Sequence, residues 1–530
     1  MKIKKSLLVL SAVASIFGVT LGLCSCGNND VDDDPFALDL KDDREFDDEG
    51  NVIFEGVEID LWTIIGDPDL SVYRTLIDNF NREYRGKIKV NYRSIGHYDF
   101  YNNLDSTWSS DRDSAPDFLF MHNEKTGEYA NKGVLYPIDS ILEETNYEFD
   151  FSNVYENIDR GQFYKDHRFG VPVDAHGFLT HFRQDIIKKN NLGFDNNTRF
   201  IPNSREEYQS LLERLKTKAN SSEGLLIRNI LKGEDHSWKK ANPSTFYPEA
   251  NQSTDPDGLG ALYANGGTMT TNDGRTISFG ENEGFKTYIT DLVSRFNDKL
   301  MGPIAGNGQE NFPIGTNVIF SEGPWWTAQN FIPNFNNSEL KKVGNGVTEE
   351  ESKDPVYTNP LLASNSAGFW TLEANKNSEN GSKWYGNGHA FSLTRKNKSM
   401  TKALACLEFA KWFTQGYTID EKTQRYDYNL AYWGNGGHIP AWKNVYESDY
   451  YKELEEKLPT LKALGDPNDI IAMEPLAYET TVFDAVNKSV ATVISKLESG
   501  EISTSEDALN VVKQIITSAQ VSLDTLYENE

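Results

Sequence analysis

Hydrophobic and polar positions alternate over residues 57–61 and again over residues 88–92, which is typical of β-strands with one buried face. Between these two segments, apolar side chains recur with helical spacing from Val72 to Tyr84, and Arg85-Gly86 ends the pattern. Strand, helix and strand in this order predict a βαβ unit. Such a unit places its two strands in a parallel sheet, so we expect an α/β domain.

Further elements follow along the chain. A short apolar segment at residues 117–121 predicts a third strand, and residues 401–413 predict a helix. Residues 185–385 combine helical patterns with long polar loops. Near the end of the chain, Ser503 and Glu506 form a capping-box pattern that predicts the start of a last helix. The expected buried face of that helix consists of Leu509, Val512, Ile515, Ile516 and Ala519.

The N-terminal segment has the pattern of an export signal. Three lysines precede an uncharged apolar run over residues 7–23, and the sequence Leu23-Cys24-Ser25-Cys26 follows. Its end resembles a bacterial lipoprotein box, in which a small residue precedes the modified cysteine. Ser25 meets this requirement, so we expect residues 1–25 to be removed and Cys26 to carry the lipid. A membrane-spanning helix is the alternative, although serine and glycine dilute the apolar run.

The other cysteine and the residues after Cys26 suggest no further chemistry. Of the three cysteines, Cys406 would remain alone in an apolar helical pattern, which predicts a buried thiol and no disulfide. Residues 27–49 contain 11 acidic residues, and we expect 26–49 to be an extended acidic tether. Calcium binding is the alternative reading, but the 12-residue loop pattern is missing.

Length and charge limit the remaining possibilities. The 530 residues are enough for two large lobes, and the aromatic content of 12% is enough for extensive cores. The net charge is −28, and losing the three signal lysines would make it −31. A field of this sign repels phosphates, which argues against nucleic acid as the ligand.

Catalytic and metal-binding motifs are not apparent in the sequence. It contains no phosphate-binding glycine loop, no HExxH and no GxSxG pattern. His176 and His181 are five positions apart on an expected strand, so they should face opposite sides and share no metal. We therefore expect no metal, no cofactor and no catalytic residue. A glycosidase pair of carboxylates needs only to meet in space and stays open as an alternative.

Tryptophans near turns and small residues suggest a different chemistry. Trp62, Trp325, Trp384 and Trp433 all occur in such settings. A tryptophan with one exposed face can pack against the C–H face of a sugar, while carboxylates and amides bind the hydroxyls. Core packing is the plainer interpretation of each tryptophan taken alone.

Several motifs, in their order along the chain, resemble the extracellular solute-binding proteins of carbohydrate ABC importers, of the maltodextrin-binding type. These motifs are Ile77-Asp78-Asn79-Phe80-Asn81, Ala115-Pro116-Asp117-Phe118-Leu119-Phe120, Phe169-Gly170-Val171-Pro172, Gly323-Pro324-Trp325 and Ile439-Pro440-Ala441. The resemblance implies a two-lobed, periplasmic-binding-protein-like α/β fold with a multi-segment hinge and a ligand cleft. The N-lobe would be 50–173 plus 385–437, and the C-lobe 174–384 plus 438–530. The chain would cross between the lobes near 172–176, 384–388 and 437–442.

The resemblance also implies which residues bind the ligand. Trp62 and Asp67 lie where the first strand of the family ends in the cleft, and Trp325 matches its stacking aromatic. The other expected ligand-binding residues are Asn123, Glu124, Lys125, His176, Trp384, Trp433 and Tyr478, with Phe483 as the alternative to Tyr478. His176 stands where relatives often have an acidic residue, which leaves the particular sugar open.

The function implied is capture of a sugar, above all a neutral oligosaccharide, and its delivery to the permease subunits of an ABC transporter. The protein would be a monomer, held at the outer face of the cytoplasmic membrane by its lipid alone. Two alternatives remain, an exported glycoside hydrolase and a nearly all-helical surface glycan-binding lipoprotein. The strand patterns at 57–65 and 88–92 argue against the second.

Overall fold

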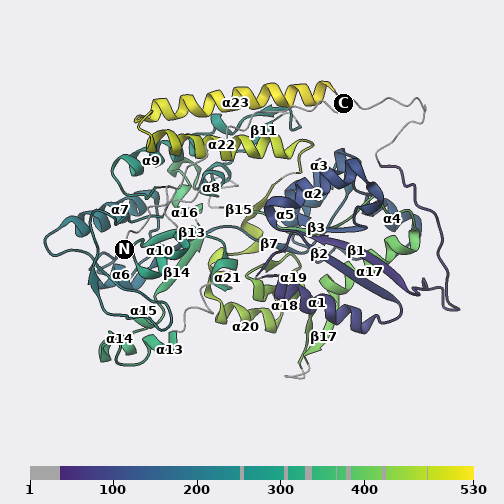
Figure 1. Cartoon of the computed structure of the whole chain (residues 1–530), viewed down its shortest axis with the longest axis horizontal. Helices are drawn as coiled ribbons and strands as arrows, with labels where there is room; N and C mark the ends of the chain where they lie inside the picture. The colour runs from purple at the N-terminus through teal and green to yellow at the C-terminus, as the bar shows by residue number, and fades with distance from the viewer. Residues whose placement is uncertain are drawn as a thin grey trace, which may run out of the picture.

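The computed structural model shows two bodies, each with its own hydrophobic core, joined by several chain segments (Figure 1). It describes residues 36–529 except 68, 251–255, 272, 304–307, 329–336, 366, 378–382, 421–424 and 474. The expected signal peptide and Cys26 lie outside the described residues. Among the described residues, none of the helices combines the length and the apolar character needed to cross a membrane.

The first body is built on a five-stranded sheet in the order β2-β1-β3-β16-β6. β1 (Val57–Thr63) pairs in parallel with β2 (Ile88–Ser94) and with β3 (Phe118–His122), which confirms the predicted strands and their βαβ arrangement. β16 (His389–Leu393) returns from far along the chain and runs antiparallel to β3 and to β6 (Val171–Pro172).

Helices predicted from the sequence pack against this sheet. α1 (Leu70–Glu83) buries an apolar face that includes Leu76, Ile77 and Phe80. α17 (Met400–Gln415) starts where the Ser399 side chain accepts a hydrogen bond from the Lys402 backbone, and Cys406 is buried in it. The other helices of five or more residues in the described part of this body are α2 (His97–Ser110), α3 (Thr126–Asn131), α4 (Ile138–Thr145) and α18 (Asn429–Trp433). α20 (Asp449–Lys457) and α21 (Pro459–Leu464) form a small apolar cluster of their own.

The second body contains a three-stranded antiparallel sheet with β8 (Leu179–Arg183) between β13 (Ile319–Glu322) and β14 (Leu361–Asn365). Its longer helices are α6 (Gln184–Lys189), α7 (Arg205–Asn220), α8 (Pro256–Ala264), α9 (Glu283–Asn297) and α10 (Gly308–Ile314). Asp185 is buried between Arg183 and Arg228 at 2.9 and 2.8 Å, so these buried charges are paired.

Two long helices at the end of the chain, α22 (Glu479–Glu498) and α23 (Ser505–Glu528), lie side by side along one edge of the molecule (Figure 1). The predicted capping box differs by one residue, because Thr504 and not Ser503 accepts from the Asp507 backbone. The buried face of α23 shifts accordingly and consists of Ala508, Val511, Val512 and Leu523, with Leu509, Ile515, Ile516 and Ala519 partly buried beside it.

The chain passes between the two cores at three places. Among the described residues, core membership changes between Leu179 and Phe182, over Trp384 to Phe391, and between Ile470 and Met473. β15 (Trp384–Gly386) pairs in parallel with β20 (Ile470–Ala472). The expected crossing at 437–442 differs: its apolar side chains belong to the first core, and β19 (Ile439–Pro440) pairs with β7 (Asp174–Ala175).

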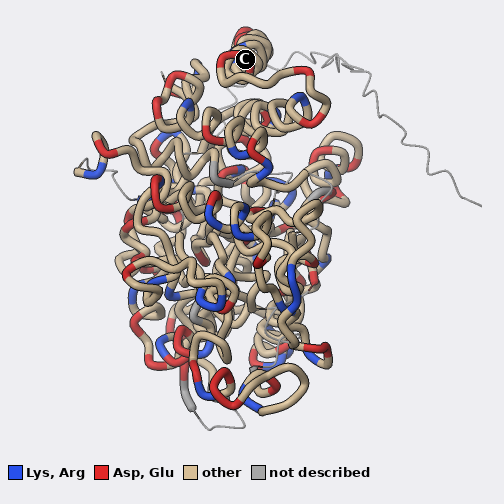
Figure 2. The backbone as a smooth tube through the Cα atoms, turned by 90° about the vertical axis from the view of Figure 1, so that its left-hand side faces the viewer, with Lys and Arg blue, Asp and Glu red and all other residues tan. Residues whose placement is uncertain are grey.

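The segment predicted as an acidic tether differs over its described part, because residues 36–49 lie against the first body. Phe36 stacks on the His167 ring at 4.8 Å, and Leu38 and Leu40 pack on the core. Asp39 forms an ion pair with Lys398. The apolar positions 36, 38 and 40 therefore offset the self-repulsion of the acidic residues. In the view of Figure 2, acidic and basic positions are interspersed along the backbone.

Candidate functional site

A buried carboxylate, Asp174, occupies the junction between the two bodies. β7 carries it immediately before the first passage of the chain into the second body. Its oxygens accept hydrogen bonds from the His389 backbone at 3.0 Å and from the Trp433 indole at 2.6 Å. Because the side chain is fully buried, these donors replace water as its partners.

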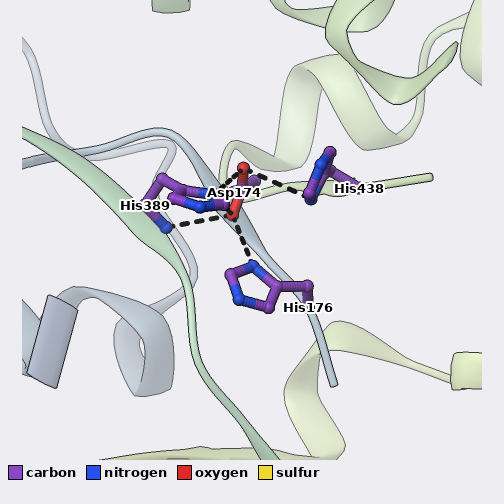
Figure 3. A group of neighbouring side chains, drawn as sticks. All are labelled: Asp174, His176, His389 and His438. Carbon is purple, nitrogen blue, oxygen red and sulfur yellow. Dashed lines mark hydrogen bonds and ion pairs between the residues drawn. The ribbon is translucent and has the colours of Figure 1, made fainter. Parts of the chain in front are cut away.

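Three imidazoles converge on this carboxylate through the same ring nitrogen (Figure 3). The Nδ1 atom lies 3.2 Å from a carboxylate oxygen in His176, 2.8 Å in His389 and 3.7 Å in His438. All three side chains are buried. They come from three chain segments: the end of β7, the start of β16 and the loop before β19.

The outer nitrogen of His438 faces a second carboxylate. Its Nε2 lies 3.4 Å from an oxygen of Asp69, at the start of α1. Its Nδ1, on the side of Asp174, has no hydrogen-bond partner among the described residues. His438 thus lies between two carboxylates, and it stacks on Trp433.

Burial and charge act on these groups in opposite directions. Burial raises the pKa of Asp174, but His389 and His438 outweigh it and hold that pKa well below its ordinary value. Burial lowers the pKa of His438, yet Asp174 and Asp69 raise it overall. Burial lowers the pKa of His389 to about 3. The site therefore favours the ionised form of Asp174.

Two further histidines extend the cluster. The His122 ring lies 4.9 Å from that of His389 and 5.6 Å from that of His176, and the His97 ring lies 5.2 Å from that of His122. Burial lowers the pKa of His97 to about 4. Five of the eight histidines of the chain therefore gather at one place.

Trp325, from the second body, lies against this cluster. Its ring meets His176 edge to face at 5.4 Å and lies nearly parallel to His438 at 6.4 Å. The ring is partly exposed, whereas the neighbouring Trp326 is buried with Phe312 and Phe320. The two adjacent tryptophans thus have different environments.

The two bodies touch at Gly437. A β-carbon at this position would lie 2.7 Å from the backbone nitrogen of Trp325 and 2.8 Å from the Pro324 carbonyl. Gly437 also has a φ of +90°, which favours glycine. The backbone of the Trp325 turn therefore rests directly on the loop that carries His438.

Asn123 and Glu124 lie beside the histidines, at the end of β3. Both amide atoms of Asn123 are buried without a hydrogen-bond partner among the described residues. Glu124 lies 3.3 Å from the His122 ring nitrogen. Burial raises the pKa of Glu124, but His122 and Lys125 lower it to about 2, so it is ionised. This segment offers an amide and a carboxylate for hydrogen bonding.

Lys125 forms its contacts with α22 and not with the histidines. Its ammonium forms an ion pair with Glu479 of α22 and a hydrogen bond of 2.6 Å to Thr480. Glu128 accepts from the Thr480 backbone at 3.0 Å. These contacts link α3 and the residues before it to α22, so they connect the first body to the second.

The other predicted ligand-binding residues lie apart from one another. Trp62 is buried under Arg93, Asp67 is exposed in the turn after β1, and Trp384 is buried in β15. Trp433 is fully buried and donates to Asp174. Tyr478 packs against Tyr527 at the end of α23. The structure therefore brings together Trp325, His176, Asn123 and Glu124. The buried Trp433 lies next to this group.

Sequence reasoning missed Asp174, His389, His438 and Asp69. A signal was present: Asp174 and His176 are two positions apart on a strand, which places them on one face. His389 and His438 each follow a glycine. His181, by contrast, faces Trp326 and the Glu322 carbonyl in the second body, away from His176.

The comparisons with known proteins agree with this architecture. No family model matches the chain in sequence, and no curated protein matches it either. Among solved structures, the GacH receptor of Streptomyces glaucescens, described unliganded and in complex with acarbose, matches with a TM-score of 0.60 at 14% identity. The match covers 87% of this chain and 98% of that one.

Two other structures match equally well. The sugar-binding protein MalE from Xanthomonas citri has a TM-score of 0.61 at 13% identity, covering 89% of this chain and 100% of its own. UgpB from Mycobacterium tuberculosis, in complex with glycerophosphocholine, has a TM-score of 0.61 at 14% identity, covering 89% and 99%. The chain therefore has the periplasmic-binding-protein-like α/β fold of the MalE structures. At such low identities the likeness shows the fold and leaves the ligand open.

Proposed function

We propose that this protein is an extracytoplasmic solute-binding protein that captures a neutral sugar, above all an oligosaccharide, and delivers it to the permease of an ABC transporter. The fold is the observation that carries the proposal, because it is shared over nearly the whole chain with proteins described as binding sugars. A lipid on Cys26 would anchor the protein to the membrane. No step of this task requires catalysis.

The arrangement around Trp325 supports a sugar ligand. Its partly exposed ring belongs to the second body and lies against His176 of the first, so a ligand bound there would contact both bodies. Asn123 and Glu124 supply hydrogen-bonding groups within the same region, and the amide of Asn123 has no partner among the described residues. An aromatic face beside an amide and a carboxylate suits the C–H and hydroxyl groups of a sugar ring.

A thermal-shift screen tests the proposal. The panel contains neutral mono- and oligosaccharides, amino acids, and glycerophosphocholine as a charged solute. Because a ligand that binds only the folded state raises stability by mass action, one or more sugars should raise Tm in a concentration-dependent way. Stabilisation by amino acids or glycerophosphocholine with every sugar inert would contradict the proposal. Incubation with the stabilising oligosaccharide should leave it intact, whereas cleavage products would indicate the hydrolase alternative.

A further inference from the structure

The cluster of Asp174, His176, His389 and His438 has the composition of a metal-ion site. Three imidazoles and one carboxylate offer one ligand atom each, and these four atoms all lie within 4.8 Å of one another. All four residues are buried, and they reach one point from three chain segments (Figure 3). We propose that this cluster binds one divalent transition-metal cation of the Zn²⁺ type, independently of any sugar.

The distances agree with this assignment. Zinc–nitrogen and zinc–oxygen bonds of roughly 2.0–2.1 Å in a tetrahedron place neighbouring ligand atoms roughly 3.3–3.4 Å apart. The three imidazole Nδ1 atoms lie 2.8, 3.2 and 3.7 Å from the Asp174 oxygens. These distances run to both oxygens of Asp174, and the four ligand atoms all lie within 4.8 Å of one another, so the side chains would rotate toward a common point to enclose a cation.

His438 gives an independent reason for a cation. Its Nε2 faces the Asp69 carboxylate, and a hydrogen bond there places a ring proton on Nε2. Its Nδ1 lies on the side of Asp174, 3.7 Å from a carboxylate oxygen, and has no hydrogen-bond partner among the described residues. A cation bound between the two groups would give this buried nitrogen a partner.

The surrounding residues also suit a metal ion. Metal-binding histidines commonly donate their outer nitrogen to a carboxylate, as His438 does to Asp69. Trp433 and the backbone of His389 donate to Asp174 and fix its orientation. His176 and His389 also place Nδ1 within hydrogen-bond distance of Asp174, and a metal ion bound there would replace the ring protons on these nitrogens.

The donor set also selects the kind of ion. Imidazole nitrogen suits Zn²⁺ and the neighbouring transition metals, whereas Ca²⁺ and Mg²⁺ take oxygen ligands. The cluster provides three nitrogens and no thiolate. A bound ion would tie β7, the start of β16 and the loop before β19 together at the first passage between the bodies. This departs from the sequence analysis, which expects no metal.

Zinc binding to the purified, chelator-treated full chain is the direct test, with Zn²⁺ alone as the probe and no sugar present. We expect one zinc per chain after gel filtration and a higher Tm with Zn²⁺ than with chelator. Co²⁺ in place of Zn²⁺ should give the visible absorption of a four-coordinate site. His438→Gln should lower the zinc affinity at least a hundredfold. His167→Gln, which removes a histidine that packs on Phe36 away from the cluster, should leave it unchanged.

A second variant covers the case in which His438→Gln does not fold. Asp69 is near the surface and binds no metal itself, so Asp69→Asn should keep the fold and lower the zinc affinity about ten- to a hundredfold through the orientation of His438. Wild-type protein that retains no zinc and shows no change of Tm would overturn the proposal and leave a protonated His438 as the positive centre. Unchanged zinc binding in Asp69→Asn together with His438→Gln would overturn it as well.

Discussion

The indole of Trp433 lies parallel to the imidazole of His438, with ring centroids 4.6 Å apart and an interplanar angle of 5°. The same indole donates its Nε1 hydrogen to Asp174 at 2.6 Å. Trp433 is fully buried, so neither of its faces is free for a sugar. Its position instead makes it a support for the histidine cluster.

The first prediction compares two buried tryptophans. Trp433→Phe removes a hydrogen bond to an ionised carboxylate, and Trp442→Phe removes one to the neutral Pro172 carbonyl. Hydrogen bonds to charged groups contribute about 1.5–3 kcal/mol and neutral ones about 1 kcal/mol. Both changes lose the same volume, so Trp433→Phe should be the more destabilising in denaturant unfolding. Equal losses would mean that the charge of Asp174 adds nothing to this contact.

The second prediction concerns the adjacent Trp325 and Trp326. Trp325→Ala should weaken sugar binding at least tenfold, about 1.4 kcal/mol, and leave Tm almost unchanged, because its ring is partly exposed. Trp326→Ala should cost about 3–5 kcal/mol of stability, because its ring fills the core with Phe312 and Phe320. Calorimetric titration and thermal melts on both variants provide the measurement. Two purely destabilised variants would assign both rings to the core.

The third prediction tests the ion pair between the bodies. Lys125→Met removes the partner of the buried Glu479, whose pKa burial raises to about 8, and should cost about 1–3 kcal/mol of unfolding free energy. Adding Glu479→Gln in the same chain should recover most of this loss. Lys488→Met, which breaks an exposed pair with Asp484 on the same α22, should cost less than about 1 kcal/mol. A double variant no more stable than Lys125→Met would refute the explanation.

The fourth prediction is a pH dependence at Glu128. Burial raises its pKa, but Lys125 and Lys132 outweigh burial and lower it to about 2. A carboxylate whose pKa is lower in the folded state stabilises the protein above its unfolded pKa of ~4.3, and this contribution is lost as the pH falls toward 2. Glu128→Gln should therefore cost roughly 2–3 kcal/mol at pH 7 and about half of that at pH 3.

Melting curves of wild type and Glu128→Gln at the two pH values measure this difference. The exposed Glu143 is the matched control, and Glu143→Gln should have no effect at either pH. A loss for Glu128→Gln that stays constant from pH 7 to pH 3 would show that the carboxylate is not ionised by its lysine neighbours.

The fifth prediction concerns the membrane anchor. Replacing Cys26 by Ala should prevent lipidation and release the protein in soluble form, because the lipid is the expected means of attachment. Fractionation of cells that express each form provides the measurement, with Cys24→Ala as the matched control that should stay in the membrane. Retention of the Cys26→Ala protein in the membrane fraction would favour a spanning helix instead.

Local sequence patterns predicted the first sheet well. The alternation at 57–61 and 88–92 corresponds to β1 and β2, because one face of each strand is buried whatever the rest of the chain does. The described part of the acidic segment was interpreted less well. The apolar alternation at Phe36, Leu38 and Leu40 packs this segment on the first core despite the acidic residues around it.

The histidine cluster could not be predicted in the same way. Asp174 and His389 are 215 positions apart, and no local pattern states that β7 and β16 meet. The glycines before His389 and His438 mark places where two backbones approach closely. A β-carbon at Gly388, for example, would lie 2.2 Å from the Asp174 carbonyl oxygen. The reason for these glycines can be given only once the close approach of the backbones is known.

The contact at Gly437 leaves no space for a side chain between the two bodies. Any side chain there would act as a wedge against the backbone of Pro324 and Trp325. Gly437→Ala would therefore hold the bodies apart without removing a single ligand-binding group. Under the proposed function, such a chain would hold Trp325 away from the groups of the first body, so a solute bound between the bodies would lose contacts with one of them.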